Sequence, residues 1–310
     1  MYVPDPVDQA LVEERVASAA RPPGRVVLVG AGPGSVELLT LKAARLIAAA
    51  DWLVHDALVQ PEVLALAVRA EVISVGKRAG RSSTRQHDIN RTLIDCARNG
   101  GLVVRLKGGD PLMFARAQEE LEALREAGVA VEVVPGITTA QAAHAALAAP
   151  MTERGRRRSM VFATPQAQAP AAGPFTEAGA GGPGVQWARA LVNAGGGALY
   201  MASSVAVRIR ATLLSLGMPA DTPATWVVNV SLPGQVVVAT TVGELAPLPQ
   251  EHAGQPALLL VGTAVPAPAP DVAFQPAAIE AAPCPAASAR PFSRVVAQSL
   301  REPATATLSA

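Results

Sequence analysis

The stretch VVLVGAGPGSVELLTLKAA, residues 26 to 44, opens on an apolar run, breaks at glycines and continues as a helical pattern. A buried strand, a tight loop and a helix in this order are typical of nucleotide-binding units. The loop is not a dinucleotide fingerprint, because the third glycine falls at Gly34 rather than at position 35, and Pro33 has no N–H for a pyrophosphate. We therefore expect a stiff loop whose glycines let a ligand or another backbone segment come close.

Strand-like and helix-like stretches alternate on the carboxyl side of this loop. Strands are expected at WLVHD, EVISVG, GLVVRLKG and VAVEVVPG, and helices between them, the first from about Glu37 to Ala50. This alternation predicts parallel strands with right-handed crossovers and helices on both faces. Further on, a short SLPG link joins two strands too closely for a helical crossover, which predicts an antiparallel pair. The fold class is therefore two α/β domains, an open parallel sheet at 25–150 and a mixed sheet at 151–265.

The composition indicates which class of protein this is and which partners are less expected. The chain has 310 residues, 50% of them hydrophobic and 16% charged, which is typical of globular proteins with room for two domains. A net charge of +1 gives no global field for nucleic acid. The leader at 1–24, an insertion at 165–184 and an Ala/Pro-rich tail at 266–310 have compositions that predict no packed structure.

The positions of cysteines, histidines and apolar residues indicate which compartment and which kinds of site to expect. Cys96 and Cys284 are far apart, and the four histidines lack metal-ligand spacing, so we expect no disulfide and no metal. There is neither a signal-peptide pattern nor an apolar run of about 18 residues. We therefore expect a cytoplasmic protein that binds neither membrane nor nucleic acid.

The stretch RLKGGDPLMF, residues 105 to 114, carries the most specific chemistry. Two glycines and an Asp-Pro pair after a strand predict a sharp turn that aims backbone groups and the Asp110 carboxylate into a cleft. Ligands of open parallel sheets bind at this edge, where the strands end. A turn that holds no ligand is the alternative for this stretch taken alone.

Taken in order, GAGPGSVELLTLKA, VGKRAG, RLKGGDPLMF and VPGITTA resemble the tetrapyrrole methylase family, above all its members that methylate uroporphyrinogen III. The resemblance runs from about Val26 to Val265. It implies that S-adenosylmethionine (SAM) binds as co-substrate in a cleft between the two domains. The positions that match the family's cofactor contacts are Pro33, Gly108, Gly109, Asp110, Met113, Thr138, Thr139, Met201 and Val230.

The same resemblance implies a reaction and an assembly. Two methyl groups would pass to ring carbons of uroporphyrinogen III and give precorrin-2, which leads to sirohaem and cobalamin. Asp56 and Lys77 stand at the positions of the family's proton acceptor and proton donor. Without the resemblance, a turn acid and a surface lysine are the simpler interpretations of these residues. The family also implies a homodimer.

The expected substrate carries eight carboxylates, so a basic site is required on a nearly neutral protein. Candidate partners are Arg78, Arg81, Arg116 and Arg154, because the guanidinium group pairs well with carboxylates. Solvated basic loops are the alternative. Nucleic-acid binding is a weaker interpretation, because aromatic residues are not interleaved with the basic ones.

Several positions depart from the family pattern. Ala115 and Ala117 replace glycines, which predicts lost backbone freedom, Val230 replaces a glycine, and Glu153 replaces a histidine on the side of the acidic substrate. Two alternatives therefore stay open: a precorrin methylase acting at another ring carbon, and a degenerate relative that binds SAM or a tetrapyrrole without turnover.

Overall fold

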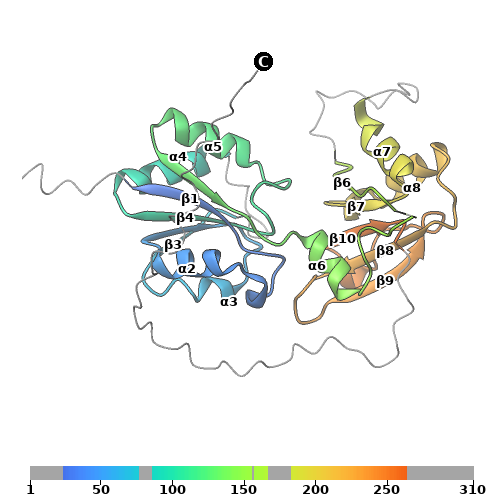
Figure 1. The fold of residues 1–310 in the computed structure, drawn as a ribbon, viewed down its shortest axis with the longest axis horizontal. Helices are drawn as coiled ribbons and strands as arrows, with labels where there is room; N and C mark the ends of the chain where they lie inside the picture. Colours follow the sequence, from blue (N-terminus) through green and yellow to red (C-terminus); the bar gives the residue numbers. More distant parts are fainter. Residues whose placement is uncertain (1–23, 77–85, 156, 167–182, 264–310) are drawn as a thin grey trace, which may run out of the picture. The chain divides into compact units, whose positions relative to one another are not determined.

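The computed structural model of the chain describes residues 24–76, 86–155, 157–166 and 183–263 (Figure 1). The predicted tail, most of the predicted insertion and nearly all of the predicted leader lie outside these ranges. The described residues form two five-stranded sheets.

The first sheet is entirely parallel, as the alternation of strands and helices predicts. Its strand order is β3-β2-β4-β1-β5, so β4 lies at its centre, between β2 and β1. The strands are β1 (Arg25–Gly30), β2 (Trp52–His55), β3 (Glu71–Ser74), β4 (Leu102–Lys107) and β5 (Ala130–Val134).

Helices cover both faces of this sheet (Figure 1). Because side chains alternate along a strand, Val27 and Val29 of β1 pack toward α2 and α3, while Val26 and Leu28 pack toward α4 and α5. All four valine and leucine side chains are fully buried. The helices are α2 (Leu41–Ala49), α3 (Pro61–Leu64), α4 (Gln86–Arg98) and α5 (Ala117–Glu126).

The first helix starts later than the sequence pattern predicts. A 3-10 turn at Val36–Leu38 precedes α2, and Leu41 is the first residue of the helix. The Thr40 hydroxyl accepts a hydrogen bond from the Ala43 N–H at 3.1 Å, as an N-cap does. The expected single helix from Glu37 to Ala50 is therefore wrong at its start, because the cap at Thr40 separates two elements.

The second sheet is mixed, with strand order β6-β7-β10-β8-β9. β6 and β7 are parallel and the other pairs antiparallel, including β8 and β9 across the SLPG link, as predicted. The strands are β6 (Val161–Ala163), β7 (Gly197–Leu199), β8 (Pro223–Val228), β9 (Val236–Thr241) and β10 (Ala257–Val261).

Helices also lie on both faces of the second sheet. α7 (Gln186–Ala194) and α8 (Ala206–Ser215) share one core with it, and α6 (Thr139–Ala146) buries its alanines in the other. Further 3-10 turns lie at Pro183–Val185, Ser203–Val205 and Gln250–His252. Within the described ranges, no helix is long and apolar enough to cross a membrane.

Candidate functional site

Three loops meet at the carboxyl edge of the first sheet, after β1, β4 and β5. Gly32 and Gly109 exchange backbone hydrogen bonds, with N···O distances of 2.7 and 3.2 Å. A Cβ on Gly136 would lie 2.2 Å from the Gly109 carbonyl oxygen, and one on Gly30 would lie 2.6 Å from Gly136 Cα. Only glycine permits this approach, so these glycines hold the loops against one another.

The Asp110 carboxylate joins two of these loops. Its Oδ1 accepts a hydrogen bond from the Leu112 N–H at 2.9 Å, and its Oδ2 accepts one from the Gly136 N–H at 3.0 Å. Asp110 thus fixes the turn after β4 and ties it to the loop after β5.

Gly108 and Gly109 differ from Gly30 and Gly136 in the space around their Cα atoms. A Cβ on Gly108 would meet nothing closer than Leu58 Cβ, at 4.0 Å, and one on Gly109 nothing closer than Thr138 Cα, at 4.0 Å. Gly109 has a left-handed φ of 66°, whereas Gly108 does not have positive φ. The two glycines leave a cradle at the sheet edge that a ligand can approach closely.

Residues from the second half of the chain contact these loops. The Tyr200 hydroxyl hydrogen-bonds with the Thr138 hydroxyl and accepts from the Ala140 N–H at 3.3 Å. Its ring lies 5.0 Å from that of Phe114, between centroids. Burial raises the pKa of Tyr200, and its hydrogen bonds with Thr138 and Ala140 oppose that shift.

A second contact involves the loop after β1. The Ser35 N–H donates to the Ser231 hydroxyl at 3.1 Å, and a Cβ on Gly34 would collide with Leu232 at 2.7 Å. The structure thus brings the neighbourhoods of several predicted cofactor residues into contact: Pro33 beside Gly34, Thr138 and Thr139 at the start of α6, Met113 beside Phe114, Met201 after Tyr200, and Val230 before Ser231.

Asp56 lies directly after β2, beside the glycine loops. Its N–H donates to the Leu106 carbonyl at 3.3 Å, and its Oδ1 accepts a hydrogen bond from Arg105 Nη2 at 2.6 Å. About a third of its side chain, 34%, is exposed. One carboxylate oxygen is therefore fixed by a buried cation while the side chain still reaches solvent.

The predicted proton donor Lys77 lies outside the described residues, as do Arg78 and Arg81. The residue before Lys77 is Gly76, and a Cβ there would lie 1.9 Å from the Ala57 nitrogen. Gly76 therefore packs against the backbone next to Asp56.

Three buried charged residues near Asp56 were not among the predicted site residues. Arg105 and Lys107 of β4 are 2% exposed, and Glu120 of α5 is fully buried. Glu120 Oε1 accepts from Arg105 Nε and Nη2 at 3.2 and 3.1 Å and from Lys107 Nζ at 2.7 Å. Burial lowers the pKa of Lys107, Arg105 lowers it further, and Glu120 raises it. The sequence feature that could have indicated these buried charges is the strand LVVRLK, in which an Arg and a Lys stand at alternate positions of an otherwise apolar stretch.

The two described candidate substrate arginines belong to different elements. Arg116, the N-cap of α5, makes two hydrogen bonds of 2.7 Å to the Glu119 carboxylate, which raise the pKa of Arg116. Arg154 is exposed, in a turn closed by reciprocal 2.9 Å backbone hydrogen bonds between Glu153 and Arg157.

The positions where the family has glycine do not need glycine in this chain. Positive φ occurs at the neighbours instead, Phe114 at 51° and Arg116 at 54°, and not at Ala115 or Ala117. Neither alanine therefore lies in the backbone region that favours glycine. Val230 does not have positive φ either; it is buried and lies between two left-handed residues, at 229 and 231.

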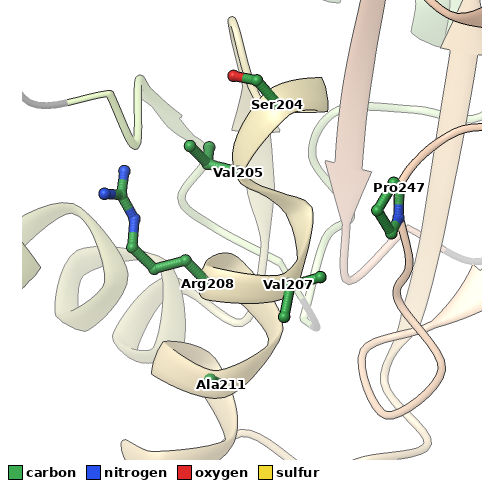
Figure 2. A pocket seen from close by; sticks show the side chains of 6 residues that line it. All are labelled: Ser204, Val205, Val207, Arg208, Ala211 and Pro247. Atoms are coloured by element: carbon green, nitrogen blue, oxygen red, sulfur yellow. The ribbon is translucent and has the colours of Figure 1, made fainter.

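An open cavity of about 390 Å³ lies elsewhere, along α8 (Figure 2). Arg208 Nη2 donates to the Pro165 carbonyl at 2.7 Å beside it, and the Gln166 side chain donates to the Ser204 hydroxyl at 3.2 Å. None of the predicted site residues lines it; its lining residues are Ser204, Val205, Val207, Arg208, Ala211 and Pro247. In the described part of the chain, no three His, Cys, Asp or Glu side chains are grouped as a metal site requires.

Comparison with known proteins places the chain in a family. Residues 25–246 match the model of the tetrapyrrole (corrin/porphyrin) methylases. Siroheme synthase 1 of Klebsiella pneumoniae is 39% identical over 255 residues, 82% of this chain and 52% of that protein. Siroheme synthase 1 of Cronobacter sakazakii is 40% identical, with similar coverage. The chain thus spans about half the length of these curated relatives.

Solved structures agree with this match. The uroporphyrin-III C-methyl transferase of Thermus thermophilus in complex with S-adenyl homocysteine has a TM-score of 0.63 at 36% identity, over 77% of this chain and 97% of that one. A cobalt precorrin-4 methyltransferase has a TM-score of 0.64 at 27% identity, over 77% and 94% of the two chains. The chain therefore belongs to the tetrapyrrole methylases.

Proposed function

We propose that this protein transfers methyl groups from SAM to two ring carbons of uroporphyrinogen III and thereby forms precorrin-2. The observation that carries the proposal is the cradle at Gly108 and Gly109, held between loops that Asp110 and Gly136 tie together. The relative that is named for this reaction and was solved with S-adenyl homocysteine shares 36% identity.

The residues around the cradle suit SAM chemically. SAM supplies a methyl group on a sulfonium, and its adenine and amino-acid parts need an apolar slot and backbone hydrogen-bonding groups. Gly108 and Gly109 leave their backbone open to such a ligand, and Val230 and Thr138 are buried nearby in the chain segments that contact these loops. Pro33, Met113, Thr139 and Met201 complete the proposed set.

Asp56 is the proposed proton acceptor. When a ring carbon gains a methyl group, the macrocycle must lose a proton, and a positioned carboxylate accelerates this step. Arg105 holds Asp56 Oδ1, while the third of the side chain that is exposed can meet substrate. Lys77 is proposed as a proton donor to another atom of the macrocycle, from which a second proton passes to solvent, so that each methyl transfer releases one proton in total. Arg78, Arg81, Arg116 and Arg154 are proposed to bind substrate carboxylates.

A second candidate function is methylation of a different tetrapyrrole at a different ring carbon. The similarity to a cobalt precorrin-4 methyltransferase, at 27% identity, favours a methylase for a later corrin precursor. The chain spans about half the length of the siroheme synthases that it resembles, so siroheme synthesis as a whole is not proposed for it.

Label transfer from SAM separates these candidates. The purified protein is incubated with labelled SAM and either uroporphyrinogen III or cobalt-precorrin-4, with heat-denatured protein as control. Label in the uroporphyrinogen III product supports the proposal, and label only in the cobalt-precorrin-4 product supports the second candidate. Calorimetric binding of S-adenosylhomocysteine without transfer to either acceptor would indicate a non-catalytic binding protein.

A further inference from the structure

The buried charges behind Asp56 form one connected cluster. Arg105 and Lys107 are two residues apart on β4, so their side chains leave the same face of the sheet, toward Glu120 of α5. Gln86 of α4 also donates to Glu120 Oε1, at 3.3 Å. The second Glu120 oxygen, Oε2, is buried and has no hydrogen-bond partner among the described residues.

Arg105 connects this cluster to the sheet edge. Its Nη2 donates to Asp56 Oδ1 at 2.6 Å and to Glu120 Oε1 at 3.1 Å, so a single nitrogen donates hydrogen bonds to both carboxylates. Lys107 donates to the same Glu120 oxygen. Asp56, with 34% of its side chain exposed, is the most solvent-accessible of the four charged groups.

The charges of these four residues balance when all are ionised: two cations and two carboxylates. Lys107 and Arg105 both donate to Glu120, so Arg105 is not the sole cation that neutralises the Glu120 carboxylate. Without Lys107, the Glu120 carboxylate would compete more strongly with Asp56 for the Arg105 guanidinium. Without the charge of Glu120, two buried cations would act on Asp56.

We propose that Lys107 and Glu120 are positioning residues, which balance the charge around Arg105 and so set the orientation of Asp56. The catalytic consequence rests on the proposed function, in which Asp56 accepts a proton. The structural consequence does not rest on the proposed function: it is that the orientation of the Asp56 carboxylate depends on Lys107 and Glu120.

Three variants test the pair: Lys107→Met, Glu120→Gln and the double variant. Each single variant unbalances the cluster and should lower kcat with uroporphyrinogen III about tenfold or more, since a misplaced catalytic group loses up to about 10²-fold. The double variant is balanced again, so its kcat should return to within about threefold of the wild type. The affinity for S-adenosylhomocysteine should change little in all three.

A second readout does not depend on turnover. The chemical shift of the Asp56 carboxyl carbon is followed by carbon-13 NMR and assigned with Asp56→Asn. It should move in Lys107→Met and in Glu120→Gln, because the contact between Asp56 and Arg105 changes, and lie near the wild-type value in the double variant. Lys42→Met, which removes an exposed partner of Glu132, is the matched control and should change neither kcat nor the Asp56 chemical shift.

The outcomes separate the two proposals. A chemical shift of Asp56 that moves in both single variants and returns in the double variant, in an enzyme without methyl transfer, would support the positioning role and contradict the proposed function. Full kcat and an unchanged Asp56 chemical shift in both single variants would overturn the positioning role. If the single variants do not fold, a folded double variant with near wild-type kcat and Asp56 chemical shift supports it, and a double variant that is unfolded, inactive or shifted overturns it.

Discussion

Glycines at the edge of the first sheet serve two different purposes. Gly30 and Gly136 have no space for a side chain because other backbone atoms occupy it, whereas a Cβ on Gly108 would make only an ordinary van der Waals contact with Leu58, at 4.0 Å. The first kind supports the fold, and the second leaves room for a ligand. Substitution by alanine should therefore separate stability from binding.

We expect Gly136→Ala to destabilise the protein, because its Cβ would lie 2.2 Å from the Gly109 carbonyl oxygen. Overpacking of this kind costs about 1–3 kcal/mol of unfolding free energy. Gly108→Ala should leave the unfolding free energy almost unchanged and weaken S-adenosylhomocysteine binding. Urea unfolding and calorimetry measure the two effects. Equal stability of Gly136→Ala and wild type would contradict the packing account.

Asp110 should affect binding through the loops that it joins. In Asp110→Asn, an NH₂ group replaces one of two oxygens that accept backbone N–H groups, from Leu112 and Gly136. We expect the Kd for S-adenosylhomocysteine to rise about tenfold, roughly 1.4 kcal/mol. Calorimetry measures this, with the exposed Asp221→Asn as control. An unchanged Kd would show that the loops keep their arrangement without the carboxylate.

At the scale of elements, helix α6 contains a buried titratable group. His144 is 3% exposed, and its Nδ1 lies 2.9 Å from the Ala149 carbonyl, to which it donates when protonated there. Its Nε2 has no partner among the described residues. Burial lowers the pKa of His144, the positive charge of Arg157 lowers it further, and the Ala149 carbonyl opposes both.

This predicts acid sensitivity of the fold. Because the folded-state pKa lies below the ordinary value of about 6.5, the unfolded chain binds more protons in the window beneath that value. The contribution of His144 to stability is therefore present above about pH 6.5 and is lost as the pH falls through the folded-state pKa. Denaturant unfolding between about pH 8 and pH 5 should show a smaller loss for His144→Gln than for wild type. The exposed His87→Gln should behave as wild type does, and identical slopes for all three proteins would refute the assignment.

The elements were largely predictable because apolar periodicity and turn residues act locally. The stretch QHDINRTLIDCAR forms α4 as its pattern predicts, while the start of α2 depends on the Thr40 cap, which the periodicity did not reveal. The charge cluster was not predicted, because an Arg, a Lys and a Glu look like solvated residues until β4 and α5 bury them together. The sequence also did not reveal which residues of this loop have positive φ: Phe114 and Arg116 have it, and Ala115 does not.

For the whole molecule we predict a homodimer. The family resemblance implies a homodimer, and a dimer with closed two-fold symmetry is the commonest assembly of soluble homo-oligomers. Light scattering coupled to gel filtration at micromolar concentration should give twice the chain mass of 31.7 kDa. A monomer mass across the accessible concentration range would exclude a stable dimer.

The central claim is the double methylation of uroporphyrinogen III, and the mass of the reaction product tests it most directly. The wild-type protein with excess SAM and uroporphyrinogen III should convert the substrate to a product that carries two added methyl groups, with Asp56→Asn slower by at least about 10²-fold. A wild-type reaction that leaves uroporphyrinogen III at its original mass, under conditions in which S-adenosylhomocysteine binds, would contradict the account.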